Sequence, residues 1–226
     1  MNNPLVEEWN TPYQCVPFDK IKNEHFVPAL QFAIEQAKKE INEIANNPAT
    51  PTFENTIVAL DNSGALVDRV STILSNLNSA ETSPELQKIA KETSPMLSEY
   101  SNDVLLNENL FKRIKQIYDS RNTLNLDAES QMLLEKTYKR FARNGANLNP
   151  SQKELLRSID KRLAALALQF GENVLNDTNE FLLELTDEKD LAGLPDFVKE
   201  AAKETAKKKN KKGYVFTLQA PSYIPF

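Results

Sequence analysis

Apolar residues recur at spacings of three and four along most of this chain, and this periodicity constrains the fold more than any other feature. Within residues 23–46, one such stripe consists of Phe26, Leu30, Ile34, Ala37, Ile41 and Ile44. Side chains at these spacings line one face of an α-helix, and by default such a stripe packs into the core. Only five glycines occur among 226 residues, which disfavours tightly turned sheets. The sequence therefore predicts a mainly α fold built from a multi-helix domain.

Capping residues and prolines divide the periodic pattern into separate helices. The first helix should end at Asn47-Pro48. Further helices are expected over residues 52–78, from Ser83-Pro84 and Ser94-Pro95 as two helices or one kinked helix, from Asn107, over 127–145, and over 149–176. Gly64 is expected in the interior of the second helix, as a point of close packing.

Two short segments alternate with a period of two, which is typical of strands. They cover residues 181–185 and 214–218, with a helix from about Pro195 between them, so they can pair as a small two-stranded β element near the C-terminal end. Three prolines among residues 3–19 predict an extended arm. The predicted organisation is an extended N-terminal arm over 1–22, a helical N-terminal domain over 23–176 and a strand–helix–strand segment over 177–226. We expect residues 224–226 to be extended and the protein to be truncated there.

Charge and cysteine content limit the partners and the compartment. The net charge of −5 repels phosphate backbones, so nucleic acid is not expected as a partner. The lysine-rich run at 207–212 is interpreted as a solvated helix end, where cations complement the helix dipole. The single Cys15 excludes an intrachain disulfide and fits a reducing compartment, so we expect a cytoplasmic protein. No segment reaches the roughly 20 apolar residues of a membrane span and no secretion signal is visible, so no membrane is expected as a partner.

The sequence lacks the residue sets of the common catalytic chemistries. A zincin site needs two histidines one helical turn apart, as in H-E-x-x-H, and this chain has only His25. His25 and Cys15 have no recognised zinc-ligand spacing, and a histidine at a helix start more often makes a local hydrogen bond. The chain also lacks a G-x-S-x-G elbow and a glycine-rich phosphate loop. We therefore expect no catalytic, no cofactor-binding and no metal-binding residue here.

Six segments carry a resemblance to a known group of proteins. They are residues 17–30, 47–64, 140–148, 170–175, 191–195 and 217–223. The first includes Glu24-His25-Phe26-Val27-Pro28-Ala29-Leu30, and the second includes Pro51-Thr52-Phe53-Glu54-Asn55-Thr56-Ile57. In this order they resemble the N-terminal region of the thimet oligopeptidase, oligopeptidase A and dipeptidyl carboxypeptidase family of zinc metallopeptidases. The run 53–64 is most similar to the bacterial peptidyl-dipeptidase branch.

The resemblance implies a largely helical peptidase whose two halves enclose a channel that admits short peptides. In that family zinc is held by an H-E-x-x-H helix and a downstream glutamate, and this chain contains neither. The resemblance therefore implies zinc in the full-length parent protein and none bound by this chain. Short peptide substrates would be reached through the missing catalytic half, with release of C-terminal dipeptides, and the chain alone should be inactive.

A second reading of the same residues is a non-enzymatic helical module for protein interaction. If the catalytic half of a peptidase normally packs against this chain, its absence should leave some apolar side chains in water. The expected exposed residues lie close to the C-terminal end, at Pro221, Tyr223, Ile224 and Phe226. An exposed apolar patch favours association, so weak self-association or partial disorder of this tail is expected.

Overall fold

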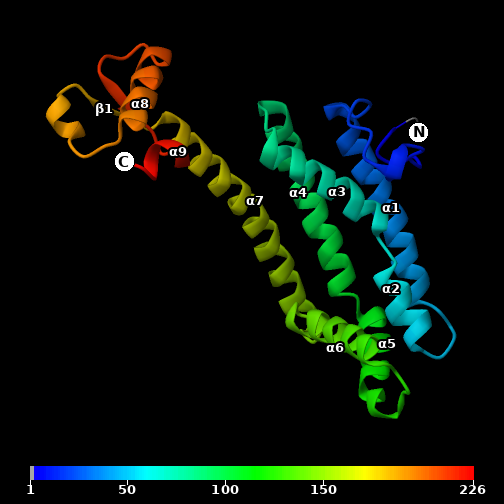
Figure 1. Ribbon diagram of the computed structural model, residues 1–226. Helices are drawn as coiled ribbons and strands as arrows, with labels where there is room; N and C mark the ends of the chain where they lie inside the picture. Colours follow the sequence, from blue (N-terminus) through cyan, green and yellow to red (C-terminus); the bar gives the residue numbers. More distant parts are fainter. Residues whose placement is uncertain (1–2) are drawn as a thin grey trace. The chain divides into compact units, whose positions relative to one another are not determined.

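The computed structural model describes residues 3–226, and these residues form two compact units, one that ends at Ala165 and one that covers Leu166–Phe226 (Figure 1). The boundary between the units falls inside a single helix, α7 (Pro150–Glu180). The boundary predicted between residues 176 and 177 lies farther along the same helix. The predicted fold class is confirmed, because the chain is mainly helical and carries one small two-stranded sheet near its C-terminal end.

The residues before the first long helix pack onto the first unit. The described part of this arm, residues 3–22, contains a short 3-10 turn, η1 (Pro12–Gln14), and no α-helix. Leu5 is fully buried in the core, and its carbonyl oxygen accepts a hydrogen bond of 2.7 Å from Arg69 Nη2. A second 3-10 turn, η2 (Asn23–His25), leads into α1 (Phe26–Ala45), whose predicted apolar stripe is buried.

The single helix predicted over residues 52–78 is wrong, because the chain turns at Gly64. Thr52 caps a π-helical segment, η3 (Phe53–Val58), which continues into α2 (Ala59–Asp61), and α3 (Ala65–Ala80) then starts separately. Gly64 lies between them at φ +74°, a left-handed conformation that glycine adopts without a steric penalty. Its backbone N–H donates to Glu40 Oε2 at 2.9 Å, which fixes the break against α1. The expectation that Gly64 sits in a helix interior is therefore also wrong.

The next helices begin at the predicted caps. Ser83, Asn107 and Asp127 each accept a backbone hydrogen bond from the residue three positions later, at the starts of α4 (Pro84–Leu105), α5 (Glu108–Asp119) and α6 (Ala128–Arg143). A 3-10 turn, η4 (Arg121–Thr123), lies between the last two. Of the two alternatives for residues 84–105, one helix is correct. It runs through Pro95 because its packing on α1 and α3 outweighs the cost of an internal proline, about 3 kcal/mol.

Two apolar clusters form the core of the first unit. One joins the arm and the first half of α1 to α3 and α4, and the other joins the end of α1 to α5, α6 and η3. In the second cluster the ring of Tyr138 stacks on those of Tyr118 and Phe111. The turn after α6 contains Gly145 at φ +93°, and the N–H of Ala146 donates to the carbonyl of Phe141 (3.1 Å).

The second unit contains the predicted strands in shorter form. β1 (Leu183–Leu185) pairs antiparallel with β2 (Tyr214–Phe216), and α8 (Asp196–Lys208) packs on β2 around the buried Leu191 and Val198. A 3-10 turn, η5 (Glu188–Leu191), and a short helix, α9 (Ala220–Tyr223), complete the unit. The short helix at 220–223, directly before the last three residues, was not predicted, because its four residues are too few to show a helical period.

α7 begins at the predicted cap, but most of the apolar residues that recur along it at spacings of three and four are not buried. Asn149 and Gln152 exchange side-chain to backbone hydrogen bonds of 2.9 and 3.2 Å. The predicted apolar stripe of this helix consists of Leu156, Ile159, Leu163, Leu166, Phe170 and Val174. Leu156 is half-buried, and the other five are exposed. The default assignment of this stripe to the core is therefore wrong.

Candidate functional site

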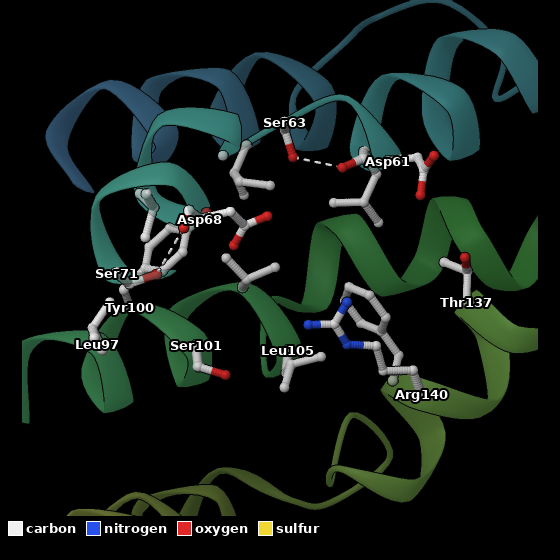
Figure 2. Close-up of a pocket in the computed structure, with 16 residues that line it drawn as sticks. Asp61, Ser63, Asp68, Ser71, Leu97, Tyr100, Ser101, Leu105, Thr137 and Arg140 are labelled. Atoms are coloured by element: carbon white, nitrogen blue, oxygen red, sulfur yellow. Dashed lines mark hydrogen bonds between the residues drawn. The ribbon is translucent and has the colours of Figure 1, made fainter. Parts of the chain in front are cut away.

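A polar pocket of about 380 Å³ lies in the first unit, where three parts of the chain meet (Figure 2). The α2–α3 turn and α3 supply Asp61, Ser63, Gly64 and Asp68, α4 supplies Tyr100 and Ser101, and α6 supplies Thr137 and Arg140. The turn at the helix break, residues 61–64, forms part of the pocket wall.

Tyr100 and Gly64 define the wall of the pocket nearest to α1. A Cβ atom at Gly64 would lie 2.7 Å from the hydroxyl oxygen of Tyr100, far closer than such atoms pack. The absence of a side chain at Gly64 therefore leaves room for the hydroxyl group of Tyr100. Burial raises the pKa of Tyr100, and the charges of Asp68 and Glu40 raise it further, whereas Arg140 acts in the opposite direction. The phenol stays protonated at neutral pH and can donate a hydrogen bond.

Two opposite charges face the same space. Figure 2 shows Asp68 on α3 and Arg140 on α6 reaching into the pocket from different elements. Both residues are exposed, so water screens their charges. The pocket can therefore hydrogen-bond a small polar molecule, with an acceptor at Asp68 and donors at Tyr100 and Arg140.

The groups that line the pocket are of few chemical kinds. Its lining, all within residues 41–141, contains neither histidine nor cysteine, and the groups that face it are hydroxyls, carboxylates and one guanidinium. A hydroxyl nucleophile needs a neighbouring base within hydrogen-bond reach. The hydroxyl groups of Ser63 and Ser71 instead donate to the backbone carbonyls of Leu60 (2.7 Å) and Asp68 (3.2 Å).

The two residues weighed as metal ligands lie apart from this pocket. His25 Nδ1 accepts a 3.1 Å hydrogen bond from the backbone N–H of Lys22, so the ring stabilises the start of α1. Cys15 is a free, exposed thiol in the arm. Nowhere in residues 3–226 do three His, Cys, Asp or Glu side chains gather in a way that could hold a metal ion.

The lysine-rich run lies at the end of α8, where the sequence placed it. Lys207 pairs with Glu204 (2.6 Å), and Lys211 pairs with Glu184 on β1 (2.6 Å). The run is exposed along its whole length. None of the helices between residues 3 and 226 combines the length and the hydropathy of a membrane crossing.

The C-terminal residues expected to be exposed are exposed. Tyr223, Ile224 and Phe226 each keep half or more of their surface in water, and Pro221 is exposed as well. Self-association through these residues stays a prediction.

From the sequence, Gly64 was singled out as a point of close packing inside a helix, and no role in a pocket was predicted for Tyr100, Asp61, Asp68 or Arg140. Asp61 and Asp68 lie on the solvent side of their helices, and about 70 residues separate Asp68 from Arg140. Their meeting depends on how α3, α4 and α6 pack. The only local signal was the sequence Asn62-Ser63-Gly64, which is typical of a turn.

The chain is similar to several peptidases. It is 37% identical over 207 residues to the dipeptidyl carboxypeptidase of Salmonella typhimurium and 36% identical over 207 residues to that of Escherichia coli. It is also 33% identical over 225 residues to oligopeptidase A of Escherichia coli. These matches cover 92%, 92% and 100% of the chain but only 30%, 30% and 32% of the relatives. No protein-family profile matches the chain. The chain therefore spans about a third of the length of the curated relatives it matches.

Proposed function

We propose, because this chain is a homologue of the dipeptidyl carboxypeptidases and oligopeptidases A, that it forms the helical, non-catalytic part of a peptidase that acts on short peptides. The observation that carries this proposal is a match of 33–37% identity across 92–100% of the chain. The match to about a third of each relative supports the view that this chain corresponds to one structural part of such an enzyme. In this part the packed helices α1 to α6 serve as one wall of the channel that admits peptides.

The peptidase of this proposal depends on zinc, and the zinc is bound outside this chain. The residues in hand do not fit a zinc site, because residues 3–226 bring no three candidate ligands together and His25 is engaged at a helix start. No catalytic step is assigned to any residue here. The role of this chain is to shape the path of the peptide and to exclude folded proteins by size.

The subtype and the setting are also part of the proposal. The similarity of residues 53–64 to the peptidyl-dipeptidase branch supports release of C-terminal dipeptides. A net charge of −5 supports the absence of nucleic acid among the partners. A single cysteine supports a reducing compartment, and we propose the cytoplasm.

A peptidase assay on the purified chain tests the inactive role. Quenched fluorescent peptides of five to ten residues are incubated with the chain, with and without added zinc, and oligopeptidase A of Escherichia coli serves as the positive control. We expect no cleavage and no tightly held zinc by elemental analysis. Cleavage in proportion to the amount of chain, together with one zinc per chain, would overturn this role.

The coding sequence beyond the codon of Phe226 tests the parent enzyme. We expect the same reading frame to continue and to encode an H-E-x-x-H motif within a few hundred residues. A stop codon directly after Phe226, with no peptidase-like partner encoded beside it, contradicts the proposal.

A second candidate function is a helical module that holds a partner protein. The observation that favours it is the exposed apolar stripe on α7, which nothing within the described chain covers. The same reading-frame experiment separates the two functions, because only the peptidase proposal requires a zinc-binding motif downstream.

A further inference from the structure

A second polar pocket lies within the first unit, next to the pocket described above. Its volume is about 280 Å³, and it shares Ser101 and Leu105 with the first pocket. The second half of α4, the end of α6 and the start of α7 supply its walls, all between residues 98 and 160. The whole pocket therefore belongs to one compact unit, and the proposed peptidase role makes no use of it.

A buried amide without a partner faces this pocket. Asn102 on α4 is only 6% exposed, yet no residue in the part of the chain that the structure describes forms a hydrogen bond with its side-chain amide. In residues 3–226, the nitrogens that are both sealed off and unpartnered are Arg69 Nε and Arg113 Nε, so the amide of Asn102 opens onto the pocket. An amide removed from bulk water is unfavourable unless it is hydrogen-bonded. The amide is therefore available to a polar molecule in the pocket.

Two opposite charges line the same pocket and do not pair with each other. Arg143 is the last residue of α6, and Asp160 lies on α7. Among residues 3–226 neither side chain has an ion-pair partner. Arg157, on the same helix as Asp160, instead pairs with Asp103 at 2.8 Å. The pocket thus offers a guanidinium donor and a carboxylate acceptor at separate positions.

This set of groups favours a ligand that carries both charges. A lone anion such as phosphate would meet the like charge of Asp160, and a lone cation would meet that of Arg143. A small zwitterion avoids both conflicts, because its carboxylate accepts from Arg143 and its ammonium donates to Asp160. The amide of Asn102 can donate to the carboxylate or accept from the ammonium.

The volume and the apolar part of the wall limit the size of this ligand. A volume of about 280 Å³ lies just below the range of about 300–1,000 Å³ that is typical of sites for drug-sized molecules. Leu105 and Leu156 form the apolar part of the wall, which suits a short aliphatic side chain. A free amino acid or a dipeptide with small side chains meets both limits.

We propose that this second pocket binds a small zwitterion, a free amino acid or a dipeptide. Arg143 holds the carboxylate, Asp160 holds the ammonium, and Asn102 hydrogen-bonds the polar atoms between them. Arg143 is exposed and Asp160 is half-buried, so water screens part of each interaction and the binding is weak, with a Kd of about 1 mM. The proposal does not depend on the peptidase role.

Selective labelling of glycine for nuclear magnetic resonance tests where the ligand binds. Each of the five glycines follows a different type of residue, so carbonyl-13C asparagine combined with 15N glycine marks only the amide of Gly145, next to Asn144 in the wall of the second pocket. Labelled serine in the same way marks only Gly64, in the first pocket. Alanine and alanyl-alanine are titrated separately to about 50 mM. We expect the Gly145 signal to shift and saturate while the Gly64 signal stays, and the tighter binder of the two identifies the source of the zwitterion.

Matched substitutions test the roles of the side chains. Arg143→Gln and Asp160→Asn each remove one charge and should weaken binding about fivefold. Asn102→Leu removes the buried amide at similar volume and should weaken binding as well. Lys161→Gln and Glu154→Gln remove the same charges from exposed positions of α7 outside the pocket, and they should change the Kd less than about twofold. Circular dichroism checks that all variants keep their helices.

Several results would overturn the proposal. The Gly145 signal could stay unmoved by both alanine and alanyl-alanine, or a shift could be confined to Gly64, which would place the binding in the first pocket. N-acetylalaninamide, which carries neither charge, could bind as tightly as alanine. Binding that is unchanged in both Arg143→Gln and Asp160→Asn would also contradict recognition of the two charges.

Discussion

Arg113 is a buried cation that ties the loop after α1 to α5, and its replacement tests whether hydrogen bonding or desolvation dominates there. Its Nη1 donates to the carbonyl oxygens of Asn47 (2.7 Å) and Ala49 (3.0 Å), and its Nη2 donates to Asn55 Oδ1 (3.0 Å). The residue is only 7% exposed, and among the described residues its Nε finds no hydrogen-bond partner. Burial accordingly lowers the pKa of the guanidinium.

The expected loss in the free energy of unfolding when Arg113 is replaced is the difference between two effects: lost hydrogen bonds and relieved desolvation. A hydrogen bond from a charged donor contributes about 1.5–3 kcal/mol when its partner is sealed from water. Asn47 and Asn55 are only half-buried and Ala49 is exposed, so water replaces part of each bond, and about 1 kcal/mol per bond remains. Relief of the desolvation offsets about 1 kcal/mol of this total. Arg113→Met should therefore lower the free energy of unfolding by about 2 kcal/mol, and Arg113→Ala, which also leaves a cavity, by about 3–4 kcal/mol.

Urea unfolding followed by tryptophan fluorescence measures this cost where it arises. Trp9 is the only tryptophan, and it lies in the first unit, where Arg69 stacks over its ring at 4.7 Å. Lys112→Met is the matched control, because Lys112 is the exposed neighbour on the same helix, and it should change stability by less than about 0.5 kcal/mol. If Arg113→Met is as stable as the original protein, desolvation cancels the hydrogen bonds and the reasoning fails.

Further substitutions probe one helix cap and three glycines. The hydrogen bond from the N–H of Ser130 is the main cause that lowers the pKa of Asp127 in the folded protein. The ionised carboxylate therefore stabilises the fold at pH values above its unfolded pKa of about 3.9, and this stabilisation is lost as the pH falls through the pKa of the folded state. Asp127→Ala should thus lower the urea midpoint at pH 7, with a difference that shrinks below about pH 4. Gly171→Ala should stabilise α7 by about 0.5–1 kcal/mol, because nothing lies within 4 Å of the added methyl group. Gly193→Ala should instead destabilise the protein, because Gly193 has a φ of +91°, which alanine rarely adopts. Thermal unfolding followed by circular dichroism measures both effects. Gly64→Ala should cost about 2 kcal/mol by urea unfolding, and Tyr100→Phe should recover part of that cost if the clash with the hydroxyl contributes.

Local chemistry allowed the sequence to predict where most helices begin. The Ser83, Asn107, Asp127 and Asn149 caps satisfy backbone N–H groups within three residues, so no distant contact is needed to form them. The two strands were predictable for the same reason, because their alternation is local. Their lengths were not, since only the residues that pair across Leu183–Phe216 and Leu185–Tyr214 form strands.

Features that depend on packing could not be predicted from local pattern. The helical period continues on both sides of the break at Gly64, so the period did not reveal it. The groups that lie against Gly64 are distant in sequence: the carboxylate of Glu40 and the hydroxyl of Tyr100. The pocket is lined by residues of this break together with Arg140, from a helix more than 70 residues later. Packing also determines that one helix continues through Pro95. The local sequence alone was equally compatible with a new helix capped by Ser94.

The comparison of α1 with α7 explains why periodicity identified helices but not their surroundings. Both helices carry an apolar stripe at spacings of three and four, and in α1 the stripe is buried by α3, α4 and α5. In α7 a similar stripe stays in water, while a lysine and an arginine on the other face make the contacts with the unit. An apolar stripe indicates only that one face of the helix is suited to packing against another element. What covers it depends on the rest of the chain or on another chain.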